Sequence, residues 1–151
     1  MDKMKIYNKL PILVQNIACN YEGLRIKKTR YGDAFWKFLK EYEARNTWTY
    51  KEICDYRDER LRSLIEHSYK TVPYYRNLFD DLGLDYKEIR TLSDLKVLPI
   101  LDKQTINDNF DKFVSTNYDK NNLIMSHTSG TTGSGFKFYT TPEAISEQWA
   151  V

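Results

Sequence analysis

Apolar residues recur at helical spacing through the first two thirds of the chain. From Asp33 to Arg45 the apolar positions lie three, four and seven residues apart, which places them on one face of a helix. These positions are Phe35, Phe38, Leu39 and Tyr42. The spacing therefore predicts an amphipathic helix over residues 33–45.

A longer helix is predicted to begin after Thr49. The Thr49 side chain can cap the helix while Glu52, three residues later, reaches back to the Thr49 backbone. Pro73 cannot continue that helix unchanged, because its ring removes an amide donor and clashes with the preceding turn. A new helix is therefore predicted from Pro73, and Gly83 can close it in the left-handed conformation.

Shorter elements follow this pair of helices. Ser93 is expected to open a short turn, and Asp102 is expected to cap a helix with inward side chains at Ile106, Phe110 and Phe113. The helical pattern thus continues in short pieces that are joined by turns.

The pattern changes after about residue 117, where two runs typical of strands flank a polar loop. Residues 123–128 and 136–141 each have the character of a strand, and a helix is expected after Pro142. The expected fold class is α+β, with a mainly helical region over residues 1–116 and a strand-loop-strand region over residues 117–151.

The most apolar stretch near the start, Leu10 to Ala18, is predicted to be a buried helix or an extended arm. Pro11, Gln15 and Asn16 interrupt it, and it is far shorter than the roughly 20 residues that a membrane helix needs. A signal peptide is disfavoured because no small-residue cleavage site follows the apolar stretch. We therefore expect no integral membrane segment and no secretion.

Composition and charge are those of an ordinary globular protein. A length of 151 residues with 41% apolar and 29% charged residues predicts about one folded domain. The net charge of +2 gives no strong field toward polyanions, so nucleic acid is not an expected partner. Cys19 and Cys54 lie far apart without CxxC spacing, which disfavours a disulfide framework and fits a cytoplasmic location.

The segment between the two predicted strands is rich in glycine and hydroxyl residues. Three glycines in six positions let the backbone approach a ligand closely, and four hydroxyl side chains add donors beside the backbone amides. This pattern is typical of a loop that holds phosphate oxygens, although a hairpin connection without a ligand has the same composition. The loop lacks GxxxxGK[ST] spacing, which disfavours a Walker-type ATPase. The glycines are Gly130, Gly133 and Gly135, and the hydroxyl residues are Ser129, Thr131, Thr132 and Ser134.

The loop also carries a recognisable signature. Thr128-Ser129-Gly130-Thr131-Thr132-Gly133 resembles the phosphate-binding signature of the adenylate-forming superfamily, which includes acyl-CoA synthetases, luciferases and peptide-synthetase adenylation domains. Further segments resemble the phenylacetate-CoA ligase-like proteins of capsular polysaccharide gene clusters, the CapK type. These segments are Leu10-Pro11 with Gln15-Asn16, Arg30-Tyr31-Gly32, Val72-Pro73-Tyr74-Tyr75-Arg76 and Leu98-Pro99-Ile100-Leu101-Asp102-Lys103. The resemblance covers essentially all 151 residues.

The resemblance implies a ligase that uses ATP and Mg²⁺ in two steps. A carboxylate attacks the α-phosphate of ATP to give an acyl-adenylate and pyrophosphate, and CoA or another acceptor then takes the acyl group. By this analogy the β- and γ-phosphates with magnesium would be held by Ser129, Gly130, Thr131, Thr132 and Gly133. The implied partners are a small-molecule carboxylate and a nucleotide, and no catalytic residue or metal ligand is assigned.

The resemblance further implies an N-terminal fragment, in which a helical region leads into the first strands of an adenylate-forming large domain. The adenine pocket, the ribose-binding acidic residue and the lid lysine of the family would lie beyond Val151, so negligible ligase activity is expected from this chain alone. An alternative from a different class remains open. It is a stand-alone helical binding or interaction module, or a decayed gene product, in which the glycine-rich segment is only a turn.

Several residues near the signature have their own interpretations. The commoner superfamily form continues Gly-x-Pro-Lys, whereas Gly135 stands here at the proline position and Phe136 at the lysine position. Lys137 would reach phosphate only if the strand were bulged at Gly135, so a solvated strand lysine is the favoured interpretation. His127 is interpreted as structural or substrate-adjacent, and His67 is expected to interact with the last carbonyls of its helix.

Overall fold

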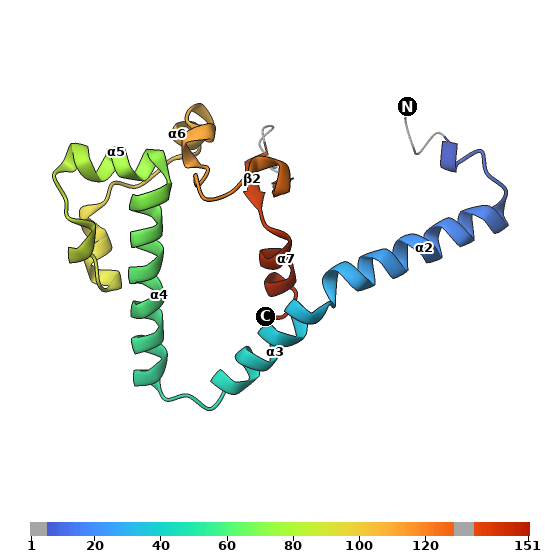
Figure 1. Cartoon of the computed structure of the whole chain (residues 1–151), viewed down its shortest axis with the longest axis horizontal. Helices are drawn as coiled ribbons and strands as arrows, with labels where there is room; N and C mark the ends of the chain where they lie inside the picture. The colour runs from blue at the N-terminus through green and yellow to red at the C-terminus, as the bar shows by residue number, and fades with distance from the viewer. Residues whose placement is uncertain (1–5, 129–134) are drawn as a thin grey trace. The chain divides into compact units, whose positions relative to one another are not determined.

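The computed structural model describes residues 6–128 and 135–151. It is predominantly helical, with one two-stranded antiparallel sheet near the C-terminus, which confirms the predicted fold class (Figure 1). In chain order the elements are α2 (Ile12–Arg30), α3 (Asp33–Arg45), α4 (Tyr50–Thr71), α5 (Pro73–Leu82), η1 (Tyr86–Glu88), η2 (Leu92–Val97), α6 (Lys103–Asp108), η3 (Phe110–Phe113), η4 (Lys120–Asn122), β1 (Ile124–His127), β2 (Lys137–Thr140) and α7 (Pro142–Gln148).

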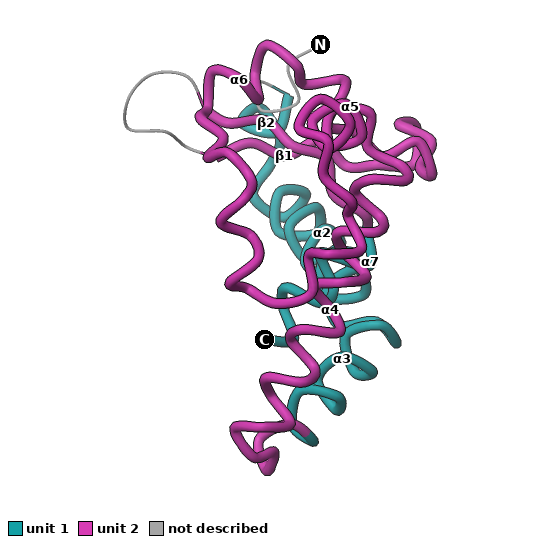
Figure 2. Tube along the Cα trace, turned by 90° about the vertical axis from the view of Figure 1, so that its left-hand side faces the viewer, with its two compact units in different colours: residues 1–44, 142–151 teal, residues 45–141 magenta. Residues whose placement is uncertain are grey.

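The chain forms two compact units (Figure 2). Unit 1 combines residues 1–44 with residues 142–151, and unit 2 is the continuous segment 45–141. Unit 1 therefore consists of segments from opposite ends of the sequence, whereas unit 2 contains both strands of the sheet.

Unit 1 is held by contacts between its N-terminal helices and the segment around α7. The Arg30 guanidinium lies 4.1 Å from the centroid of the Trp149 ring, and the Tyr42 hydroxyl donates a hydrogen bond of 2.9 Å to Glu147. Phe35 is buried on α3, as the helical spacing predicted, and the Tyr31 ring meets it edge-on at 4.9 Å.

The predicted burial of the N-terminal apolar stretch is wrong. The stretch is helical, but no residue of α2 is buried. At 100° per residue, four of the exposed apolar side chains form a stripe on one face, and the half-buried residues of α2 lie on the other side of the helix. The stripe consists of Leu13, Ile17, Tyr21 and Leu24, each at least two-thirds exposed. Within the part of the chain that the structure describes, no helix is long and apolar enough to cross a bilayer.

Unit 2 has a small core between α4 and α5. The buried cluster consists of Leu61, Ile65, Phe79 and Ile89, and half-buried side chains from η1 and η2 pack around it. Phe79 is fully buried. These four side chains come from the inner faces of both helices and from the turn that follows them, so the core joins three successive parts of the chain.

The helix boundaries of unit 2 follow from local signals. Thr49 caps α4 by accepting a hydrogen bond from the backbone N–H of Glu52, and the Glu52 carboxylate accepts one from the Thr49 N–H at 2.7 Å. Pro73 starts α5, where its missing N–H costs nothing. Gly83 ends that helix with φ of 63°, a left-handed conformation that favours glycine. All three predictions are confirmed.

Two of the predicted short elements need correction. The turn near residue 93 is opened by Thr91 rather than by Ser93, because Thr91 lies three residues before Asp94 and forms a capping box with it. Asp102 caps α6 as predicted, through a bond of 2.7 Å from the backbone N–H of Thr105. However, α6 ends at Asp108, so Phe110 and Phe113 belong to the separate 3-10 helix η3.

The Asp94 cap makes a pH-dependent contribution to stability. Hydrogen bonds from the backbone N–H of Arg90 and from the side chain and N–H of Thr91 lower the pKa of Asp94. Because the pKa is lowered, the contribution is present above the ordinary aspartate pKa of about 3.9 and is lost as the pH falls through the lowered value. We expect Asp94→Asn to lower the urea midpoint at pH 6, and this difference from the wild type should shrink toward pH 2. An unchanging difference would contradict the assignment.

Candidate functional site

The five predicted phosphate-binding residues lie outside the described residues. They are Ser129, Gly130, Thr131, Thr132 and Gly133. The structure describes the strands on both sides of them, β1 and β2. Residue 128 is described on one side and residue 135 on the other.

The strands β1 and β2 form an antiparallel hairpin around this segment. Ile124 is opposite Thr140, and the register continues one residue at a time to His127 opposite Lys137. Both strands were predicted, and each is shorter than its predicted range. The signature segment therefore connects two strands that are hydrogen-bonded to each other.

The residues next to the strands extend the pairing. The backbone N–H of Thr128 donates to the carbonyl oxygen of Phe136 at 2.9 Å, and the N–H of Phe136 donates to the Thr128 hydroxyl at 3.1 Å. A Cβ atom at Gly135 would lie 2.2 Å from the Thr128 carbonyl oxygen, a distance that real Cβ atoms essentially never show. Glycine at position 135 is thus required by the backbone on the opposite side of the hairpin.

The side chains of the hairpin are arranged as the alternation of a strand predicts. The rings of Phe136 and Phe138 are stacked 6.2 Å apart on one face of the strand, so Lys137 between them points to the other face. The register runs without an inserted residue from Phe136 to Thr140, so no bulge lies within residues 136–140. Lys137 is exposed, in agreement with the prediction of a solvated lysine.

His127 is exposed at the end of β1, opposite Lys137. The imidazole of His127 and the ammonium group of Lys137 are therefore cross-strand neighbours. Neither side chain carries a negative charge that would repel an anion. His67 behaves differently from the prediction. Its Nε2 atom lies 3.2 Å from the Thr71 hydroxyl, and its ring meets Tyr118 edge-on, so its ring pairs with side chains rather than with terminal carbonyls.

Contacts at two described places join this end of unit 2 to its helical part, the first in the segment before the hairpin and the second in β2 itself. At the first, the backbone N–H of Thr116 donates to the Thr71 carbonyl oxygen at 2.7 Å, and the Ser115 hydroxyl donates to the Thr71 hydroxyl at 2.9 Å. At the second, the rings of Phe110 and Tyr139 lie 5.4 Å apart. Sequence reasoning missed these attachments because they join residues far apart in the chain, and no local signal marks them.

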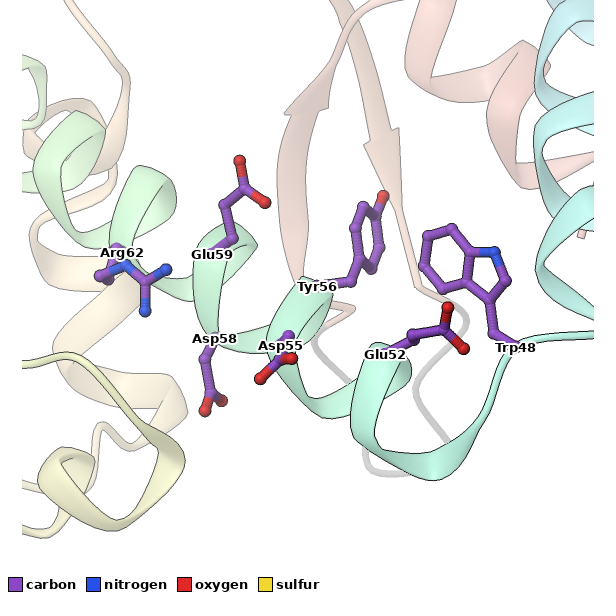
Figure 3. Close-up of a pocket in the computed structure, with 7 residues that line it drawn as sticks. All are labelled: Trp48, Glu52, Asp55, Tyr56, Asp58, Glu59 and Arg62. Atoms are coloured by element: carbon purple, nitrogen blue, oxygen red, sulfur yellow. The ribbon is translucent and has the colours of Figure 1, made fainter.

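A separate open groove lies along the first half of α4 (Figure 3). Its volume is about 580 Å³, and its lining residues are Trp48, Glu52, Asp55, Tyr56, Asp58, Glu59 and Arg62. Four carboxylates outnumber one guanidinium, so this groove disfavours phosphate on electrostatic grounds. No group of three or more His, Cys, Asp or Glu side chains in residues 6–128 and 135–151 is placed to hold a metal ion.

Several groups of the groove are already engaged within the protein. Glu52 belongs to the capping box, and bonds from the Thr49 backbone and side chain lower the pKa of its carboxyl. Asp58 pairs with Arg57 at 2.8 Å. The Arg45 guanidinium lies 4.5 Å from the centroid of the Tyr56 ring. The groove is therefore better explained as a charged helix surface than as the nucleotide site.

Comparison with known proteins gives a consistent set of relatives. No family model matches the chain. Protein CapK of Staphylococcus aureus is 28% identical over 145 residues, which cover 96% of this chain and 30% of that protein. The phenylacetate-coenzyme A ligase of Escherichia coli is 36% identical over 85 residues, which cover 54% of this chain and 19% of the ligase.

A phenylacetate-coenzyme A ligase of Thermus thermophilus is also 36% identical, over 77 residues that cover 50% of this chain and 17% of the ligase. The chain thus spans less than a third of the length of each of these relatives. It is homologous to CapK and to phenylacetate-coenzyme A ligases over that part of their length, which confirms the resemblance drawn from the sequence.

Proposed function

We propose that this chain, a homologue of CapK and of phenylacetate-coenzyme A ligases over part of their length, carries the phosphate-binding loop of an ATP-dependent adenylate-forming ligase. In the complete reaction a carboxylate would displace pyrophosphate from ATP to give an acyl-adenylate. CoA or another acceptor would then take the acyl group. The contribution of this chain is to hold the phosphates, with the helices of unit 2 supporting the hairpin that bears the loop.

The observation that carries the proposal is the position of the signature at the end of a paired hairpin. The segment 129–134 lies between Thr128 and Gly135, and Thr128 is hydrogen-bonded to Phe136, the residue after Gly135. Binding of an anion by backbone amides and hydroxyls requires that these donors be held in place before the ligand arrives. A closed pair of strands supplies such a support, and a solvent-exposed turn between unpaired ends would not.

The residues of the signature fit a magnesium-bound triphosphate by their chemistry. The hydroxyls of Ser129, Thr131 and Thr132 and the amides of Gly130 and Gly133 are neutral donors suited to phosphate oxygens. Mg²⁺ would neutralise part of the phosphate charge when the nucleotide is bound. This chain's own task is to orient the β- and γ-phosphates so that pyrophosphate can leave.

Isothermal titration of the full chain with magnesium ATP tests this function. We expect saturable binding that the double variant Thr131→Ala/Thr132→Ala weakens about a hundredfold or more, because hydrogen bonds to a charged ligand contribute roughly 1.5–3 kcal/mol each. Ser93→Ala is the matched control, since it removes an exposed hydroxyl far from the hairpin in sequence. A cooperatively folded chain that shows no saturable binding would refute the proposal.

A second candidate function is a helical interaction module. The exposed apolar stripe of α2 favours it, because contiguous apolar surface on a soluble protein commonly marks a binding site. The titration separates the two candidates, since an interaction module has no reason to bind magnesium ATP or to respond to changes at Thr131 and Thr132.

A further inference from the structure

The last pair of the hairpin departs from the usual antiparallel pattern. In a hydrogen-bonded antiparallel pair, the two opposed residues exchange both of their backbone N–H to carbonyl bonds. Thr128 makes its half of that exchange with the Phe136 carbonyl oxygen at 2.9 Å. The return bond from the Phe136 N–H goes instead to the Thr128 hydroxyl, at 3.1 Å. A side-chain oxygen therefore takes the place that a backbone oxygen normally fills.

The Thr128 carbonyl has turned toward Gly135. Its oxygen would lie 2.2 Å from a Cβ atom at position 135, and its carbon would lie 3.4 Å from that atom. Two features of the sequence thus depend on each other. The hydroxyl of Thr128 satisfies the Phe136 N–H, and the absence of a side chain at Gly135 leaves space for the displaced carbonyl.

We propose that Thr128 and Gly135 form a lock at the base of the phosphate-binding segment, in which Thr128 acts as a positioning residue through its bond from the Phe136 N–H. The inference rests on the proposed function and concerns the first residue of the signature, Thr128. The Thr128 hydroxyl oxygen accepts the Phe136 N–H at the base of the hairpin, which ties the residue before Ser129 to the opposite strand. The lock needs glycine at position 135, where the commoner superfamily form has proline.

Proline would be incompatible with this geometry for a simple reason. Its ring carries a Cβ atom, which would meet the Thr128 carbonyl in the same way as that of alanine. The exchange of proline for glycine at this position is therefore coupled to the turned carbonyl of Thr128.

The test measures nucleotide affinity and the Phe136 amide separately, in the full chain. Thr128→Val removes the hydroxyl with little change in shape, and Thr128→Ser keeps it. We expect the valine variant to weaken magnesium ATP binding by about two- to tenfold, the range that loss of one hydrogen bond gives. Its Phe136 amide should also exchange faster in NMR hydrogen-exchange measurements, and the serine variant should restore both values.

Gly135→Ala and Thr140→Val complete the set of variants. The alanine Cβ forces the carbonyl to move, so we expect binding to weaken by about tenfold. Thr140→Val removes a hydroxyl from the other end of the same hairpin and should leave both readouts unchanged. Thermal unfolding of each variant confirms that the chain remains folded, and the serine variant keeps the test valid if the valine variant does not fold.

Each outcome supports or overturns the lock. Faster Phe136 exchange with unchanged affinity would show that Thr128 does not position the phosphate site. Unchanged exchange in the valine variant would show that the hydroxyl does not hold the Phe136 N–H. If the wild-type chain does not bind magnesium ATP, the proposed function and the positioning role fall together, and the exchange data alone then report whether the hydrogen bond exists.

Discussion

Phe79→Ala is expected to lower the free energy of unfolding by about 3–5 kcal/mol, the usual range for removing a buried phenylalanine. Phe79 has 0% of its surface exposed and packs in the cluster with Leu61, Ile65 and Ile89. The Tyr69 ring also meets it edge-on at 5.9 Å. Natural domains have only about 5–15 kcal/mol of stability in total, so the variant should be close to unfolding at room temperature.

Urea denaturation followed by circular dichroism measures this effect, with Leu82→Ala as the matched control. Leu82 lies on the same helix but is 47% exposed, so its truncation should cost roughly 1 kcal/mol or less. Equal losses for the two variants would show that α5 does not pack through Phe79. In the absence of urea, the helical circular dichroism signal should be retained in the control and largely lost in the core variant.

Phe113→Ala is expected to cost about 2 kcal/mol, less than the core substitution because Phe113 is only half-buried. Its ring stacks on Tyr74 with centroids 4.1 Å apart and meets Tyr75 edge-on at 5.7 Å. Burial also raises the pKa of the Tyr75 hydroxyl. These rings join α5 to η3, which precedes the segment leading into the hairpin.

A double-mutant cycle of Tyr74→Ala with Phe113→Ala isolates the stacking contribution. We expect a coupling free energy of roughly 0.5–1.5 kcal/mol from urea midpoints. Additive losses would mean that the two rings stabilise the protein independently. Because Phe113 supports the region before β1, the single variant should also weaken magnesium ATP binding if the proposed function is right.

Much of unit 2 was predictable because its signals are local. The capping box of Thr49 and Glu52, the start of α5 at Pro73 and its end at Gly83 each depend on residues only a few positions apart. Such signals act through the backbone of one turn, so they need no knowledge of the tertiary structure. The misplaced turn at Ser93 shows the limit, because Thr91 is an equally suitable cap two residues earlier.

Contacts between distant segments were not predictable from the sequence. The sequence predicted a buried helix or an extended arm for residues 10–18, but it did not reveal that the apolar side chains of α2 would be exposed. The bonds from Ser115 and Thr116 to Thr71 span more than 40 residues and have no counterpart in a local pattern. Their residue types are common in loops, so composition gave no sign of them.

The sequence predicted which residue types the candidate site contains, but it did not predict the contacts of the hairpin beside them. The glycines and hydroxyls of residues 129–134 predict a phosphate-binding loop by their type and spacing, and that role stays a prediction. The division of the domains at residue 116 stays a prediction. The role of Thr128 required the hairpin register, because only the pairing with Phe136 shows that its hydroxyl replaces a backbone acceptor.

The discontinuous make-up of unit 1 has a consequence for synthesis on the ribosome. Arg30 and its partner Trp149 are separated by the whole of unit 2, and ribosomes add roughly 5–20 residues per second. Helix α2 therefore leaves the exit tunnel on the order of ten seconds before α7 can reach it. During that interval the helical core of unit 2 can fold, and the apolar stripe of α2 is available to chaperones then as it is in the folded chain. We expect this nascent helix, rather than the later core, to be the segment that such chaperones bind.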